Sequence, residues 1–192
     1  MTIEKAKASD IVGGGLTANT GASEGAKATG KYVVECFDKD GNLKWVAESK
    51  NLVVNVGLQY MAGVALTSTA QITSWYIGLY GAAASNTPDP GDTMSSHGGW
   101  TEVTAYTEST RVLANFAAAT NANPSVVTNT SSKAVFSING TTVVGGAFLT
   151  SGSAKGGTTG TLFSAADFQS PGDRSVVNGD ILNVTYTFSL SA

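Results

Sequence analysis

The sequence predicts an all-β domain, an antiparallel β-sandwich or jelly roll with one short helix and an extended N-terminal arm. Many short segments alternate apolar and polar residues and are separated by Gly, Pro, Asn and Asp, which is typical of strands joined by turns. Only one stretch has helical spacing, so a fold built from βαβ units is excluded. The first 30 residues show no sustained periodicity, which sets them apart from the rest.

The arm is predicted over residues 1–30. Its glycines interrupt any regular element; they are Gly13, Gly14, Gly15, Gly21, Gly25 and Gly30. Ile11, Val12 and Leu16 are too few to form a core of their own. We therefore expect residues 1–30 to stay flexible or to dock on another protein, and residues 31–192 to form the β domain.

A β-hairpin is predicted at the start of the domain. Residues 31–37 and 43–48 alternate as strands, and residues 38–42 (DKDGN) supply turn chemistry between them. A strand over residues 51–55 then leads into the predicted helix over residues 56–66, where apolar side chains recur at helical spacing. The turn at residues 38–42 is similar to the start of a calcium-binding loop, but it lacks the later acidic ligand of an EF-hand, so no metal site is expected there.

The remaining segments read as strands. We expect them at residues 74–80, 100–107, 110–116, 133–139, 142–150, 159–163 and 180–190. The last strand alternates most clearly, because Leu182, Val184, Tyr186, Phe188 and Leu190 share one face. This face is predicted to be core.

Charge is low and unevenly distributed. Charged residues make up 13% of the 192-residue chain, and the formal net charge is −3. Residues 1–50 hold seven of the 11 basic and seven of the 14 acidic residues. The chain has no basic footprint for nucleic acid, so nucleic-acid partners are not expected.

The sequence predicts synthesis in a reducing compartment. Cys36 is the single cysteine and cannot form an intrachain disulfide. Residues 1–10 lack the pattern of a secretory signal, and no window approaches the roughly 18 apolar residues of a spanning helix. We therefore expect a protein made in a cytoplasm, with no membrane partner.

No convincing catalytic or cofactor motif is present. His97, the single histidine, lies in a Gly/Ser loop (SSHGGW) and lacks a nucleophile elbow of the G-x-S-x-G type. Residues 21–29 only imitate a phosphate-binding loop, because Lys27 is not followed directly by Ser or Thr. One histidine and one cysteine do not make a structural zinc site. We expect no enzyme activity, no metal and no cofactor, while a hydrolase centred on His97 and paired carboxylates remain enzyme alternatives.

Aromatic residues offer an alternative binding site. Trp75, Tyr76, Trp100 and Tyr106 could line a carbohydrate-binding platform. Aromatic residues that alternate on strands are more often core, and both interpretations stay open.

Several segments resemble small virion structural proteins of tailed bacteriophages. Residues 32–45 (YVVECFDKDGNLKW) and 51–58 (NLVVNVGL) resemble the opening of such proteins. Further segments occur there in the same order: 75–79 (WYIGL), 92–102 (DTMSSHGGWTE), 107–111 (TESTR), 146–151 (GAFLTS), 155–162 (KGGTTGTL) and 178–187 (NGDILNVTYT). The resemblance covers roughly residues 32–190 and leaves the arm outside.

The resemblance implies a head decoration (cement) protein as the first expectation, with a tail or fibre component or a carbohydrate-binding adhesin module as the alternative. A cement protein would sit on the capsid exterior of the virion, bind the major capsid protein, and assemble with itself, by analogy as a homotrimer. The anchors expected in the arm are Ile11, Val12 and Leu16. The resemblance carries over no catalytic residue.

Overall fold

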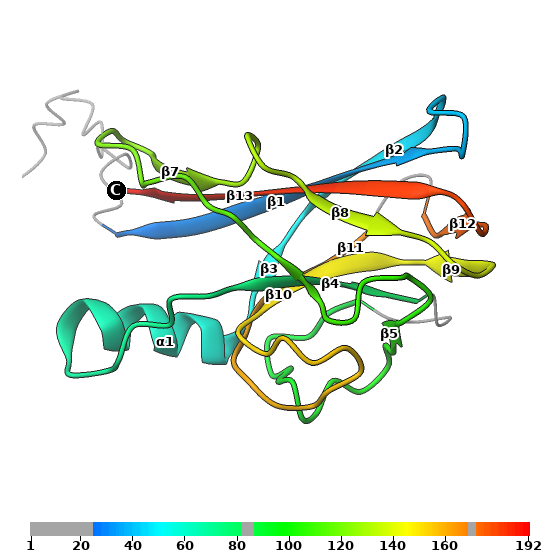
Figure 1. The fold of residues 1–192 in the computed structure, drawn as a ribbon. Helices are drawn as coiled ribbons and strands as arrows, with labels where there is room; N and C mark the ends of the chain where they lie inside the picture. The colour runs from blue at the N-terminus through cyan, green and yellow to red at the C-terminus, as the bar shows by residue number, and fades with distance from the viewer. Residues whose placement is uncertain (1–24, 82–86, 169–171) are drawn as a thin grey trace, which may run out of the picture.

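Two antiparallel β-sheets pack face to face in the computed structural model, which describes residues 25–81, 87–168 and 172–192 (Figure 1). The first sheet has the strand order β2-β1-β13-β7, and β8 also pairs with β13. Its strands are β1 (Lys27–Phe37), β2 (Leu43–Lys50), β7 (Ser125–Thr128), β8 (Ala134–Ser137) and β13 (Ile181–Ser191). The all-β sandwich prediction is confirmed, whereas the jelly-roll alternative is not.

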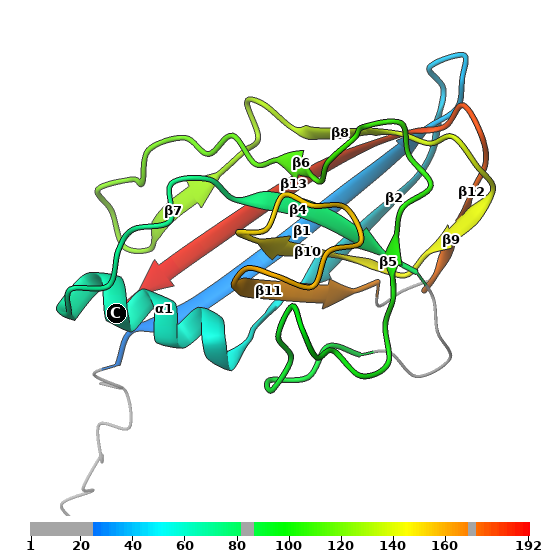
Figure 2. The ribbon, with the colours of Figure 1, turned by 60° about the horizontal axis from the view of Figure 1, so that its bottom comes forward.

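The second sheet has the order β3-β11-β10-β4-β5, and β6 also pairs with β4. Its strands are β3 (Leu52–Val53), β4 (Tyr76–Tyr80), β5 (Glu102–Val103), β6 (Val112–Leu113), β10 (Gly146–Thr150) and β11 (Leu162–Asp167). Helix α1 (Asn55–Leu66) follows β3, and β9 (Thr142–Val144) pairs with β12 (Arg174–Val176) as a separate ribbon. Both views place α1 at the end of the sandwich where β1 begins and β13 ends (Figures 1 and 2).

The long pair β1–β13 forms the centre of the first sheet. Their register runs from Lys27 opposite Ser191 to Phe37 opposite Ile181. Alternation directs Tyr32 and Val34 inward, opposite Tyr186 and Val184, and all four are buried. The face predicted from the alternation of the last strand is therefore core along most of its length, although Leu190 at the end of β13 is exposed.

The predicted hairpin joins β1 to β2. The Asp38 carboxylate accepts hydrogen bonds from the backbone N–H groups of Asp40 and Asn42, both at 2.9 Å. Gly41 adopts a φ of 84°, a conformation that a side chain disfavours. Residues 38–42 therefore form the turn between β1 and β2, as the sequence predicts.

Two apolar clusters flank the second sheet. Ile77, Leu79 and Leu149 face the first sheet and belong to the main core. Tyr80 and Phe148, on the alternate face, pack in a second cluster. The other members of this cluster are Val54, Met94, Trp100, Leu162 and Ala165. Residues 87–101 and 151–161 cover this outer face, which we call the loop face.

Several predicted boundaries differ from the structure. The domain begins before residue 31, because β1 starts at Lys27 and Gly30 pairs with Phe188. A Cβ on Gly30 would collide with the side chain of Asn51. Gly30 therefore lies inside β1 and lets Asn51 pack closely against the strand, instead of interrupting regular structure at the end of the predicted arm. The predicted helix is confirmed as α1, beginning one residue earlier, at Asn55.

The strand predictions after the helix are confirmed in part. Residues 100–107 and 110–116 contain only the two-residue strands β5 and β6. The segment 142–150 divides at Gly145 into β9 and β10, because β9 leaves the sheet to pair with β12. The short strands β7 and β12 were not predicted, since three or four residues give too little alternation to recognise.

Candidate functional site

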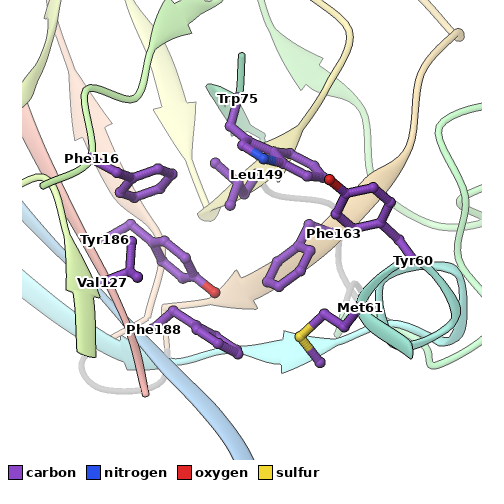
Figure 3. A pocket seen from close by; sticks show the side chains of 9 residues that line it. All are labelled: Tyr60, Met61, Trp75, Phe116, Val127, Leu149, Phe163, Tyr186 and Phe188. Atoms are coloured by element: carbon purple, nitrogen blue, oxygen red, sulfur yellow. The ribbon is translucent and has the colours of Figure 1, made fainter. Parts of the chain in front are cut away.

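An apolar pocket opens between the two sheets beside α1 (Figure 3). Its volume is about 220 Å³. Nine side chains from both sheets, α1 and the segments beside them line it: Tyr60, Met61, Trp75, Phe116, Val127, Leu149, Phe163, Tyr186 and Phe188. Such a hollow in an otherwise packed core marks a place where another group can be buried.

The pocket is held open by aromatic rings that meet edge to face. Trp75 contacts Tyr60 with 5.3 Å between ring centroids and Phe163 with 5.4 Å. Phe163 in turn contacts Phe188 at 5.5 Å. Each ring comes from a different part of the fold: Tyr60 from α1, Trp75 from the position before β4, Phe163 from β11 and Phe188 from β13. Their edges meet around the pocket and leave the space between them unfilled.

The two tyrosine hydroxyl groups of the pocket already have partners. The Tyr60 hydroxyl accepts a hydrogen bond from the backbone N–H of Ile72 at 2.7 Å, which ties α1 to the segment before β4. The Tyr186 hydroxyl accepts from the Asn51 side chain at 2.9 Å and lies 3.3 Å from Ser164 Oγ. Burial raises the pKa of Tyr186 above its usual value, because the charged phenolate would lose its contact with water.

Helix α1 is unusually apolar on its exposed side. It contains no charged residue, and only Gly57 is buried. Leu58 is 44% exposed and Leu66 86% exposed. Gly57 packs directly against the backbone carbonyl of Phe163, which brings the helix close to β11. Exposed apolar surface without charges is typical of a surface that contacts a partner.

We call this part of the molecule the helix end: α1, the apolar pocket, and the adjoining ends of β1 and β13. Leu190, 41% exposed at the end of β13, adds to its apolar surface. Residues 1–24 connect to the molecule here, because β1 begins at Lys27. The expected anchors Ile11, Val12 and Leu16 lie outside the described residues.

The predicted aromatic platform is wrong as a single surface. Trp75 lines the pocket, whereas Trp100 belongs to the cluster on the opposite side of the second sheet and Tyr106 is buried in the main core. Trp100 and Tyr106 are only 2% and 1% exposed, so neither ring can stack on a ligand at the surface. The alternation of residues along the strands did not predict on which side of the second sheet each aromatic ring would lie.

His97 lies against Trp100. The two rings stack with their centroids 3.8 Å apart, and His97 Nδ1 donates a hydrogen bond to the Trp100 carbonyl at 2.9 Å. Trp100 Nε1 donates to the Asp92 carboxylate at 3.0 Å. These contacts place His97 in the packing of the loop face, as the interpretation of His97 as a loop residue expects.

A buried ion pair fixes the loop face, and sequence reasoning missed it. The Arg111 side chain is fully buried and that of Glu102 is 7% exposed. Arg111 Nε and Nη2 donate to the two Glu102 carboxylate oxygens at 2.9 and 2.7 Å. Arg111 also donates to the carbonyls of Gly152 and Gly157, so it holds residues 151–161 against the sheet. The available signal was an arginine in a nearly uncharged stretch.

No family model, curated protein or solved structure matches the chain. Among the described residues, no group of three or more His, Cys, Asp or Glu side chains is arranged to hold a metal ion. No helix in those same residues is long and apolar enough to cross a membrane.

Proposed function

We propose that the chain is a structural component of a tailed-phage virion, a capsid decoration or cement protein that binds the outer capsid surface and bridges neighbouring capsomers. The observation that carries the proposal is the helix end, where an uncharged helix, an apolar pocket and the attachment of the N-terminal segment lie together. The uncharged helix and the apolar pocket can pack against the major capsid protein without removing ions from water, while the exposed Lys27 at the start of β1 keeps its charge in solvent.

The N-terminal segment contributes the second half of the contact. Ile11, Val12 and Leu16 would add aliphatic contacts to the capsid beyond the domain's own surface, at an entropic cost of ordering the segment. Self-association as a homotrimer belongs to the same proposal, because a symmetric oligomer presents several such segments to neighbouring capsomers.

The pocket favours apolar side chains over a sugar. Sugar hydroxyl groups need hydrogen-bond partners, but the hydroxyls of Tyr60 and Tyr186 are already engaged. The buried positions of Trp100 and Tyr106 remove the expected platform. For these reasons the decoration role takes precedence over the adhesin module.

Binding to purified heads that lack the protein tests the proposal. We expect the double variant Leu58→Asp/Leu66→Asp to bind such heads less than the unmodified chain when bound protein is measured after sedimentation. The matched control is Leu43→Asp/Val177→Asp, which changes two exposed apolar residues, 55% and 44% exposed, away from α1. We expect the control to bind normally.

Truncation tests the contribution of the N-terminal segment. The deletion should end at residue 24, because removing residues 27–30 would take away pairs of β1 with β13. We expect the truncated chain to remain folded and to show lower occupancy on heads. Absence of binding by the full chain would overturn the decoration proposal, and equal binding of the helix variant and its control would overturn the assignment of the helix end.

A further inference from the structure

The pocket at the helix end is smaller than a typical small-molecule site. Its volume of about 220 Å³ lies below the roughly 300–1,000 Å³ of most ligand sites. At roughly 30 Å³ for each water of liquid volume, it has room for about seven waters or a similar number of carbon atoms. An isoleucine side chain has four such atoms and a leucine side chain four. The pocket therefore has room for about two aliphatic side chains.

The chain itself carries such side chains within reach. Phe188 lines the pocket and pairs with Gly30, three residues beyond Lys27, so the pocket lies about 10 Å from the start of β1. Leu16 and Ile11 precede Lys27 by 11 and 16 residues. A flexible chain of these lengths has a root-mean-square span of about 17–24 Å, which exceeds the distance required.

The composition of the segment selects which residues can enter. Ile3 is followed by Glu4 and Lys5, whose charges would have to leave water beside an apolar wall. Asp10 directly precedes Ile11, but the six residues from Ile11 to Leu16 are uncharged, because Ile11 and Val12 are followed by Gly13, Gly14 and Gly15, and then by Leu16. Glycines allow the backbone to approach closely and to reverse direction, so side chains on both sides of them can face the same surface.

We propose that the segment Ile11–Leu16 folds back in the free protein and covers the apolar pocket of its own chain. A second copy is the less favourable source, because a short flexible linker gives an effective concentration of about 1 mM, well above a micromolar protein solution. The contact would bury the apolar side chains of the segment and of the pocket in the free protein. The inference stands without the capsid proposal, since it concerns the free protein.

Dye binding provides the first test. The probe is 8-anilinonaphthalene-1-sulfonate, whose fluorescence rises on apolar surface. We expect the triple variant Ile11→Asp/Val12→Asp/Leu16→Asp to show several-fold more dye fluorescence than the unmodified chain. The matched control, Thr17→Asp/Asn19→Asp/Thr20→Asp, adds the same charge to the same segment and should match the unmodified chain. Adding Met61→Lys at the pocket should abolish the increase.

Cross-linking provides the second test and identifies the source of the segment. In the variant Ile11→Cys/Met61→Cys, we expect a disulfide within one chain, seen as a fast-migrating monomer on non-reducing gels. The control Ile11→Cys/Val177→Cys places the second thiol beside β12, away from α1, and should not cross-link. The native Cys36 is fully buried and can remain.

Each outcome decides the inference. A monomeric cross-link together with increased dye binding supports it. A disulfide-linked dimer would assign the pocket to the segment of a second copy and overturn docking within the chain. Equal dye binding by the triple variant and its control, with no specific cross-link, would show that the pocket stays open to solvent and would also overturn it. None of these results depends on whether the protein binds heads.

Discussion

The loop face and the helix end flank the same sheet but are closed in different ways. On the loop face, Arg111 is fully buried, paired with Glu102 and bonded to two loop carbonyls. Lys155 adds further bonds to the carbonyls of Tyr106 and Glu108 at 2.8 and 2.7 Å. At the helix end, α1 carries no charge and the described residues leave an apolar pocket between the sheets.

The loop face has its buried polar groups paired within the chain, whereas the helix end has apolar surface that the described residues leave uncovered. Buried charges fix a loop when their donors find acceptors, and four of the five N–H groups of Arg111 donate to Glu102, Gly152 and Gly157. The helix end instead presents apolar surface whose burial needs another group. The first region is therefore expected to determine stability, and the second to determine binding.

The largest expected effect comes from Arg111→Met. The change removes the partner of the buried Glu102 and releases the carbonyls of Gly152 and Gly157. Breaking a buried ion pair by removing one partner costs about 3–5 kcal/mol, and we expect a loss of this size in the free energy of unfolding. Urea denaturation followed by tryptophan fluorescence measures it.

A double variant separates charge from packing. In Arg111→Met/Glu102→Gln no unpaired carboxylate is left, so part of the lost stability should return. If Arg111→Met alone changes stability by less than about 1 kcal/mol, the loop face is not held by this ion pair and the contrast with the helix end fails.

Trp100→Phe should have the next largest effect. A phenylalanine ring keeps much of the packing against Tyr80 and Phe148 but loses the hydrogen bond to Asp92. A hydrogen bond to a charged group contributes about 1.5–3 kcal/mol, which is the expected decrease in stability. In the double variant Trp100→Phe/Asp92→Asn, the further loss should be small, because the bond to Trp100 is already gone and an asparagine amide oxygen can still accept from the Asp89 backbone N–H.

Gly57→Ala tests the close contact of α1 with β11 at the helix end. A Cβ at this position would collide with the backbone carbonyl of Phe163, so α1 must move away from β11. We expect a loss of about 1–3 kcal/mol, measured by thermal unfolding. The matched change Gly63→Ala meets the side chain of Thr69 instead of a backbone carbonyl, so only this exposed side chain must move and we expect a smaller loss than for Gly57→Ala. Equal effects of the two changes would contradict a close contact of α1 with β11.

The sequence predicted the fold where the pattern was long and local. The β1–β2 hairpin, β13 and α1 followed from alternation, turn residues and helical spacing within about a dozen residues each. These local patterns did not predict which side chains lie on each side of the second sheet. Trp75 and Trp100 carry the same chemistry, but only the three-dimensional pairing puts one in the pocket and the other under the loops.

The pocket and the ion pair were missed for a related reason. Tyr60, Trp75 and Phe188 are separated by 15 and 113 residues, and no motif joins them. Glu102 and Arg111 lie close in sequence, but their burial depends on glycine carbonyls about 40 residues later. Ile11, Val12 and Leu16 stand out in the sequence because they form a single aliphatic cluster in a glycine-rich stretch, and their role as anchors stays a prediction.

The smallest expected change in stability is that of Leu66→Lys, and it gives the sharpest separation of folding from binding. Leu66 is 86% exposed in the last turn of α1, so its replacement removes little buried surface. A positive charge at a helix C-terminus is slightly favourable. We expect the free energy of unfolding to stay within about 0.5 kcal/mol of the original, as measured by urea denaturation.

Binding should respond differently to the same change. A lysine at Leu66 places a charge on the uncharged surface of α1, and burying it against a capsid would require removing that charge from water. Leu66→Lys should therefore lower occupancy on heads while leaving stability intact, and Leu66→Met, which keeps an apolar side chain, should bind normally. If Leu66→Lys binds as well as Leu66→Met, the exposed side of α1 faces solvent in the assembled particle, and the distinction between a stability face and a binding end does not hold.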